Sequence, residues 1–215
     1  MLEWLSTRAC ALLAAALLVA ACGSADAETS DVGAVGDPEL SGIVRDPAPQ
    51  VDEATLPSLS DGGGDVTFRA QPGNVQVVYW GFTNCPDVCP TTLADFSVAL
   101  RRLDPDLSAR VELVMVGVDP DRDLEVLDRY VNAFVPGSVA AGSSDVAELE
   151  AAAAPFGASW EVRTLDDGTV EVDHSPFLYA VDDAGQLALT WQFGASSVDM
   201  ASDLEVLLER ADDAA

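Results

Sequence analysis

Two short runs of the sequence are almost wholly apolar, and they limit the possible folds more than any other feature. The runs cover residues 75–80 and 111–118, and both are dense in valine. Runs of this length and composition are typical of strands that are buried inside a sheet. Each run is followed by a stretch with the apolar spacing of a helix, so the sequence predicts an α/β architecture in which helices cover a central sheet.

The predicted helices are amphipathic. The first begins at Pro90, a residue that suits the first turn of a helix, and its apolar stripe consists of Leu93, Phe96, Leu100 and Leu103. A second helix follows residue 118, and its apolar face consists of Leu124, Leu127, Tyr130, Val131 and Phe134. Two more are expected at about residues 145–154, where Asp145 and Glu148 have the spacing of a capping box, and at about residues 198–210.

Short strands are predicted on both sides of this pattern. Turn residues at 166–168 and 183–185 predict hairpins over residues 160–172 and 177–193. Residues 40–64 keep a few apolar positions among several prolines, which suits short edge strands. The folded domain is therefore expected over residues 40–215, as a central mixed sheet flanked by helices with an N-terminal β extension.

The first 21 residues have the pattern of a lipoprotein signal peptide. Their apolar run, residues 9–21, is shorter than the ~20 residues that a spanning helix needs, and it has the length of a signal-peptide core. The run ends in Leu-Val-Ala-Ala-Cys-Gly at residues 18–23, which resembles a bacterial lipobox and predicts a lipid on Cys22. The alternative is a plain secretory signal in which the cysteine is incidental.

A tether is predicted after the signal peptide. Residues 22–39 are rich in glycine, alanine, serine and acidic residues without apolar periodicity, so they are expected to form a flexible tether. A lipid on Cys22 would hold the protein on the outer face of the cytoplasmic membrane.

The formal net charge of −27 disfavours nucleic acid as a partner, because phosphates require a basic surface. The same charge disfavours electrostatic docking on anionic lipid.

Only Cys85 and Cys89 remain after export and lipidation of the chain. A disulfide between residues four apart closes a very small loop and stabilises little, so this pair is a better candidate for chemistry than for structure. The pair lies between a buried strand and a helix, at the edge of the sheet where α/β proteins gather reactive groups. Cys89 is expected at the helix N-terminus, where the helix dipole favours a thiolate.

A metal site needs a third donor, and the sequence offers one histidine, His174. A single histidine is more often a surface or core residue, but His174 directly precedes a predicted strand whose entry could reach the cysteine loop. Asp173 could orient a ligand as an outer partner, or it could be an ordinary loop carboxylate. Asp87 could tune the charge of the site, although a capping or turn role is the commoner one for such a residue.

Residues 81–93, Gly-Phe-Thr-Asn-Cys-Pro-Asp-Val-Cys-Pro-Thr-Thr-Leu, resemble the signature of the Sco/SenC copper-chaperone family. Residues 118–123, Val-Asp-Pro-Asp-Arg-Asp, resemble the second block of that family, and residues 173–175, Asp-His-Ser, resemble the third. The blocks follow in the family's order, and the similarity extends over essentially everything after the tether. Many members have histidine where this chain has Asn84, a position that is not one of the usual ligands.

The resemblance implies a thioredoxin-like fold in which two cysteines and one histidine bind a single copper ion. The ligands carried over by motif are Cys85, Cys89 and His174. The implied role is to deliver copper to the binuclear copper centre of cytochrome c oxidase subunit II, or to reduce the thiols of that centre. Here the lipid anchor would replace the transmembrane helix of other members. The resemblance also suggests that the Ser175–Pro176 bond is cis.

Donor chemistry favours copper and leaves alternatives open. Two thiolates and one imidazole suit Cu(I), whereas Zn(II) accepts the same donors with water in a fourth place. A disulfide between the cysteines could not hold copper in this way, so a thiol reductant is an implied partner. The alternative function is a membrane-tethered thiol–disulfide oxidoreductase that uses Cys85 and Cys89. A thiol peroxidase would need an arginine near the cysteines, and the sequence places none close to them.

Overall fold

A mixed sheet of five strands forms the centre of the part of the chain that the structure, a computed structural model, describes: residues 34–35 and 39–214. The strand order is β11–β10–β5–β6–β7. Three strands run parallel, namely β5 (Val75–Gly81), β6 (Val111–Gly117) and β7 (Val139–Ala141). The other two form an antiparallel hairpin whose first strand pairs antiparallel with β5, namely β10 (Leu178–Val181) and β11 (Leu187–Trp191). The predicted mixed sheet is confirmed.

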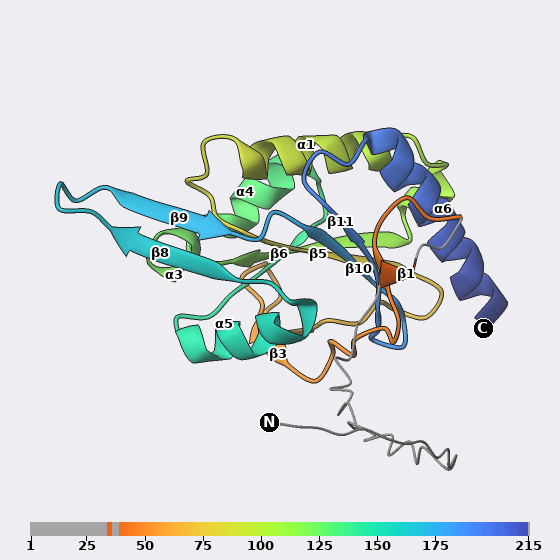
Figure 1. Ribbon diagram of the computed structural model, residues 1–215, viewed down its shortest axis with the longest axis horizontal. Coiled ribbons are helices and arrows are strands. Elements are labelled where there is room, and N and C mark those ends of the chain that lie inside the picture. The colour runs from red at the N-terminus through yellow and green to blue at the C-terminus, as the bar shows by residue number, and fades with distance from the viewer. Residues whose placement is uncertain (1–33, 36–38, 215) are drawn as a thin grey trace, which may run out of the picture. The chain divides into compact units, whose positions relative to one another are not determined.

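Helices cover both faces of this sheet (Figure 1). One face carries α1 (Val88–Leu100), α4 (Leu127–Phe134) and α6 (Ser197–Ala214). The other face carries α5 (Val146–Ala153) beside the short strand β3 (Thr55–Pro57). Single helical turns occupy the connections, namely α2 (Pro105–Ser108), α3 (Pro120–Asp123) and the 3-10 turn η1 (Ala154–Phe156). Within residues 39–214 no helix combines the length and apolar character needed to cross a bilayer.

Short strand pairs lie outside the central sheet. The strands β8 (Trp160–Thr164) and β9 (Val170–His174) form a hairpin that extends away from the sheet, on the left of Figure 1. Near the start of the described chain, β3 pairs with β4 (Asp65–Thr67), and β1 (Ala34–Val35) pairs with β2 (Val44–Arg45). Thus two residues of the predicted tether are in a strand. The predicted signal peptide and Cys22 lie outside the described residues.

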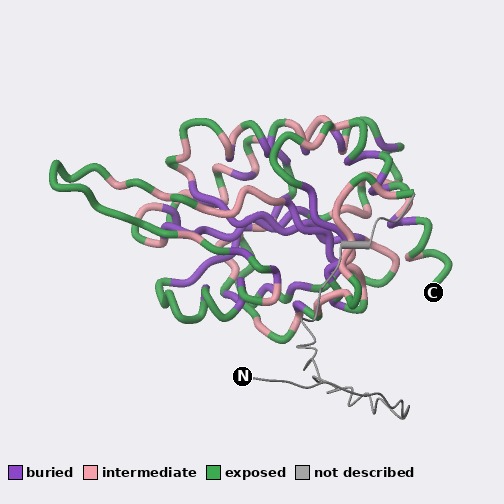
Figure 2. The backbone as a smooth tube through the Cα atoms, viewed as in Figure 1, coloured by how far each residue is buried: buried purple, intermediate pink, exposed green. Residues whose placement is uncertain are grey.

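Burial of β5 and α1 fixes the segment between them. All residues of β5 are buried, and the centre of Figure 2 shows this strand within the buried layer. On α1, Leu93 and Phe96 are fully buried, as the apolar stripe predicts. Each fully buried side chain of this size contributes about 1.5–3 kcal/mol to stability. The connecting loop, residues 82–87, is therefore held at the carboxyl edge of the sheet.

A buried carboxylate ties the start of the domain to the last helix. Asp203 on α6 accepts hydrogen bonds from the N–H groups of Ser41 and Gly42, at 2.7 and 3.1 Å, and from Trp191 Nε1 at 2.7 Å. A Cβ atom at Gly42 would lie 2.8 Å from Leu189, so only glycine allows this close approach. The segment before β2 is thus packed onto β11 and α6.

Four local predictions differ from the structure. Helix α1 begins at Val88, two residues before Pro90, because the first N–H groups of a helix need no partner within it and proline is tolerated throughout the first turn. The predicted helix after β6 is divided into α3 and α4 by a tight turn. Asp145 caps α5, but Glu148 accepts from the Ser143 hydroxyl at 2.7 Å instead of closing a capping box. The cis peptide bond of the described chain is Asp46–Pro47, not Ser175–Pro176.

Candidate metal centre

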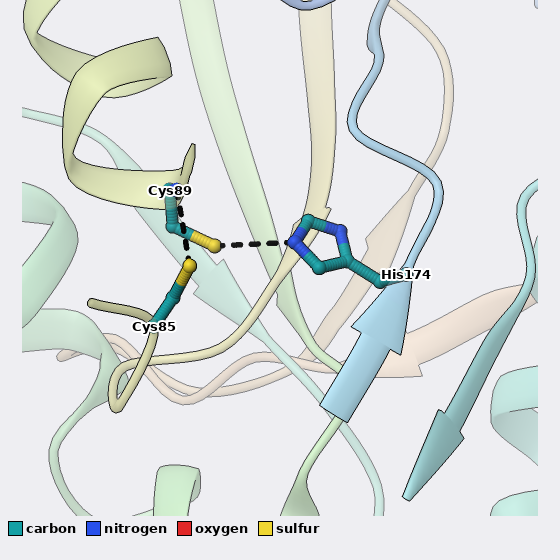
Figure 3. Close-up of side chains that lie close together, drawn as sticks. All are labelled: Cys85, Cys89 and His174. Carbon is teal, nitrogen blue, oxygen red and sulfur yellow. Dashed lines mark hydrogen bonds between the residues drawn. The ribbon is translucent and has the colours of Figure 1, made fainter. Parts of the chain in front are cut away.

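Cys85, Cys89 and His174 meet at the carboxyl edge of β5 (Figure 3). One potential ligand atom from each residue lies within 4.8 Å of the other two. The cysteines come from the loop after β5 and from the start of α1, whereas His174 ends β9, 85 positions after Cys89. Among the described residues, this is the group of three or more His, Cys, Asp or Glu side chains that is close enough to share one metal ion.

The start of α1 holds the Cys85 sulfur. Cys89 is the second residue of this helix, and its N–H donates a hydrogen bond to Cys85 Sγ at 3.3 Å. This N–H is one of the helix-terminal donors that have no partner within the helix. Both cysteines are free thiols. The structure therefore represents the reduced pair, which is the form able to bind a soft metal ion.

Cys89 is buried, and its surroundings differ from the predicted ones. The sequence predicts that the helix start favours a thiolate at Cys89, but the helix N–H points to Cys85 instead. Burial raises the pKa of the Cys89 thiol to about 12. A Cβ atom on Gly81 would lie 3.2 Å from Cys89 Sγ and 2.8 Å from the Tyr79 ring, so glycine leaves room for this sulfur. A metal ion must displace the Cys89 proton when it binds.

His174 presents Nε2 to the sulfurs. Its Nε2 lies 3.4 Å from Cys89 Sγ, and its Nδ1 lies 3.1 Å from the carbonyl oxygen of Ser175. A carbonyl oxygen only accepts, so the Nδ1 contact assigns the ring proton to Nδ1 and leaves the Nε2 lone pair for a metal ion. Burial lowers the pKa of His174 below its usual value of 6.5, which favours the neutral ring that binds metals.

Aromatic rings enclose the imidazole and fix the hairpin that carries it. The rings of Phe82 and Tyr79 meet the His174 ring edge to face, at centroid distances of 5.6 and 6.0 Å. Trp80 stacks on Trp160 at 6.0 Å with an interplanar angle of 9°. Because Trp160 is the register partner of His174, this stack holds the base of the hairpin against β5. Trp80 and Phe82 are both buried.

In the described part of the chain, neither acidic candidate is hydrogen-bonded to Cys85, Cys89 or His174. The Asp173 carboxylate bonds to Arg163 at 2.6 Å, and its side chain is 73% exposed. The His174 ring is oriented by the Ser175 carbonyl and not by Asp173. Asp87 is the N-cap residue of α1 without a capping hydrogen bond, and its carboxylate accepts from the Thr91 hydroxyl at 3.4 Å.

Sequence reasoning missed a contact between two loops beside the cysteines. Because Asp119 and Asp123 follow the predicted strand at 111–118, the sequence favours turn and cap roles for them over metal ligation. Asp119 does lie at the N-cap of α3, where it pairs with Arg122. The Asp123 carboxylate instead accepts from the N–H and the hydroxyl of Thr83, at 2.9 and 2.7 Å. The available signal was that adjacent parallel strands end at the same edge, so the loops after β5 and β6 must be neighbours.

The donor set fits a soft or borderline metal ion. Two sulfurs and one imidazole nitrogen are the ligands that Cu(I) prefers, and three donors leave a place for an incoming ligand. Zn(II) accepts the same donors with a fourth ligand. The geometry is therefore that of a site able to take up and release one metal ion.

Comparison with known proteins identifies a family and several relatives of the chain. The model of a protein family described as SCO1/SenC matches residues 58–209. The SCO1 homolog 1 of Arabidopsis thaliana, a mitochondrial protein, is 30% identical over 122 residues, which cover 56% of this chain and 36% of that protein. The chain spans about a third to just over half of the length of the curated relatives that it matches first.

Solved structures show the same fold. The apo Sco1 protein of Thermus thermophilus superposes with a TM-score of 0.60 at 32% identity, over 72% of this chain and 91% of that one. The copper-bound ScoI of Bradyrhizobium japonicum superposes with a TM-score of 0.61 at 25% identity, over 72% of this chain and 98% of that one. These likenesses confirm the thioredoxin-like fold that the sequence motifs imply.

Proposed function

Because the chain belongs to the SCO1/SenC family, we propose that it is a copper chaperone that binds one copper ion through Cys85, Cys89 and His174. Its acceptor is the binuclear copper centre of cytochrome c oxidase subunit II, to which it delivers copper or whose thiols it reduces. The observation that carries this proposal is the approach of His174 Nε2 to the sulfurs, with all three donor atoms within 4.8 Å of one another.

The unequal burial of the donors suggests how copper leaves the site. Cys89 is fully buried, whereas Cys85 is half-buried, and His174 has its Nδ1 bound to the Ser175 carbonyl. An acceptor thiol therefore approaches from the Cys85 side, while Cys89 and His174 keep the ion until a new ligand has bound. Ligand exchange of this kind moves the ion without changing its charge.

Redox state controls loading. Cys85 and Cys89 are four residues apart, and a disulfide between them would remove both thiolates from the site. A thiol reductant must therefore keep the two cysteines reduced before copper binds.

For the location, we propose that Cys22 carries a lipid and that residues 22–39 tether the domain to the outer face of the cytoplasmic membrane. One copper-binding relative of solved structure, the ScoI of Bradyrhizobium japonicum, supports the choice of copper over zinc.

Loss of the imidazole separates chaperone from oxidoreductase. We expect His174→Ala to weaken Cu(I) binding by more than about 100-fold. Loss of a residue that only orients a ligand typically weakens metal binding by about 10- to 100-fold, so a larger loss indicates a ligand. The variant should keep most of its thiol–disulfide exchange, because that reaction needs only the two sulfurs. Cu(I) affinity is measured by competition with a chelator, and exchange by reduction of a small disulfide.

Glu171→Ala provides the matched control, since Glu171 lies on the same strand with an exposed side chain that faces Arg163. It should bind Cu(I) as the wild type does. Unchanged affinity in His174→Ala would remove the histidine from the ligand set. The thiol–disulfide oxidoreductase would then be the better assignment.

A further inference from the structure

Asp123 is a buried carboxylate beside the copper site that has no part in the proposed ligand set. Its side chain is fully buried at the end of α3. One carboxylate oxygen accepts from the N–H and the hydroxyl of Thr83, at 2.9 and 2.7 Å. The other oxygen accepts from the N–H of Asp119 at 3.3 Å. The carboxylate thus joins the loop after β5 to the loop after β6.

The carboxylate is held by hydrogen bonds alone. In the described part of the chain the nearby ion pair joins Arg122 to Asp119, and Asp123 takes part in none. Burial of a carboxylate without a cation is unfavourable unless hydrogen bonds satisfy it, and Thr83 supplies two of them. From behind, Asp123 packs on the end of β6, since a Cβ atom at Gly117 would lie 3.2 Å from its Cβ. Its position is therefore fixed on both sides.

Thr83 lies between the two parts of the site that must be aligned. It precedes Cys85 by two residues, and it follows Phe82, whose ring packs on His174 at a centroid distance of 5.6 Å. A shift of Thr83 would therefore move the Cys85 sulfur and loosen the contact on the imidazole together. Neither change would require the sheet or the helices to move.

We propose that Asp123 is a positioning residue of the copper site: through Thr83 it sets where the Cys85 sulfur lies relative to Cys89 and His174. This inference rests on the proposed copper-binding function. Partners outside the ligand shell act on affinity in this way when they orient the groups that bind the metal. Asp123 itself does not touch the ion.

Four single variants and one double variant of the full chain test this role. Asp123→Asn keeps the size of the side chain but turns one acceptor oxygen into a donor. Thr83→Val removes the hydroxyl and keeps the shape, whereas Thr83→Ser keeps the hydroxyl. Asp121→Asn is the matched control, because it makes the same change two residues earlier at an exposed position of α3. Each variant is measured for Cu(I) affinity, for the sulfur-to-copper absorption band of the Cu(II) form, and for urea unfolding.

The expected result is a loss of affinity that follows the hydroxyl and the carboxylate. Asp123→Asn and Thr83→Val should each bind Cu(I) about 10-fold more weakly and shift the absorption band, because the Cys85 sulfur is no longer held in place. Thr83→Ser and Asp121→Asn should match the wild type. The Asp123→Asn/Thr83→Val double variant should bind Cu(I) no more weakly than the single variant with the lower affinity, since both substitutions act through one contact.

Two results would overturn the inference. One is wild-type affinity and an unshifted band in Thr83→Val, which keeps every backbone hydrogen bond and so should fold normally. The other is additive loss in the double variant, which would mean separate effects on stability. Failure of the proposed function is a different result, because the wild type would then bind no Cu(I) or His174→Ala would bind it equally well.

Discussion

His174 is the one nitrogen-bearing side chain of the candidate metal site, and its two ring nitrogens have different contacts. Nδ1 donates to the Ser175 carbonyl and Nε2 faces Cys89 Sγ. The ring therefore does not need to turn or change tautomer before it binds a metal ion. Since it is the one histidine of the sequence, its titration can be observed without overlap from any other.

The buried position of this ring makes the stability of the metal-free protein depend on pH. The pKa of His174 lies below 6.5 in the folded state, because burial disfavours the charged ring. The unfolded chain then binds the proton more strongly than the folded one. Stability is therefore fully present above 6.5 and is lost as the pH falls through the folded pKa.

We expect the free energy of unfolding of the wild type to fall more than that of His174→Gln between about pH 7 and about pH 5, by about 1.4 kcal/mol for each unit of pKa depression. Urea unfolding of both proteins at the two pH values measures the difference, and carboxylates contribute equally to both. An NMR titration of the ring gives the pKa directly. An equal loss in the two proteins would contradict the burial of a neutral ring.

The two thiols differ in accessibility, so they should differ in reactivity. Cys89 is buried with its pKa raised to about 12, whereas Cys85 is half-buried at the start of the site. Alkylating agents attack thiolates, so we expect iodoacetamide to modify Cys85 well before Cys89 at neutral pH. Peptide mass spectrometry over time separates the two sites. Equal rates in the native protein, or faster labelling of Cys89, would show that the buried sulfur is not protected.

At the scale of elements, the base of the β8–β9 hairpin decides where His174 lies. Trp160 begins β8, pairs with His174 in register and stacks on Trp80 of β5. The hairpin has no place in the central sheet, so this stack and the contact with the rings around His174 hold it. The distance between imidazole and sulfurs therefore depends on an aromatic pair outside the ligand set.

Removal of this stack should weaken metal binding. We expect Trp160→Ala to lower the Cu(I) affinity by about 10-fold and the free energy of unfolding by about 1 kcal/mol, because an aromatic pair is lost. Trp160→Phe should retain most of both, and Val162→Ala, at a 42% exposed position two residues along β8, should change neither. Chelator competition and urea unfolding provide the two values. Unchanged affinity in Trp160→Ala would mean that the hairpin is positioned by other contacts.

Elements with a strong local pattern could be predicted from the sequence, and contacts between loops could not. The apolar runs predicted at 75–80 and 111–118 form β5 (Val75–Gly81) and β6 (Val111–Gly117), and both hairpins turn at the predicted turn residues. The partners of Asp123 and Asp173 depend on which loops meet in space. Nothing in the local sequence indicates that Asp123 accepts a hydrogen bond from Thr83, or that Asp173 pairs with Arg163 instead of the His174 ring.

That Cys85, Cys89 and His174 lie close together could be predicted, because the motifs that contain them are extended. Their electrostatics could not, since Cys89 lies at the helix start as expected but its sulfur points into the core. Burial then outweighs the favourable end of the helix dipole, which contributes about 0.3–1 kcal/mol. The sign of a pKa shift thus depends on the direction of a side chain, which sequence patterns do not give.

At the scale of the whole molecule, metal binding should stabilise the fold. The site joins α1 to the end of the separate hairpin, so an ion bound there links two parts of the domain. At free copper about 100 times the dissociation constant, the free energy of unfolding should rise by about 2.7 kcal/mol. Urea unfolding with and without Cu(I) measures this, and addition of a chelator should reverse it. A copper-independent midpoint in the wild type, or an equal rise in His174→Ala, would contradict the site.

The separation of Cys89 and His174 by 85 positions also means that folding must come before metal binding by all three side chains. In an unfolded chain the two cysteines lie close together, but the histidine is far from them. In that state the thiols can be oxidised or can bind other ions, but the set of two sulfurs and one imidazole has not yet formed. All three side chains can therefore bind one ion only after the domain has folded.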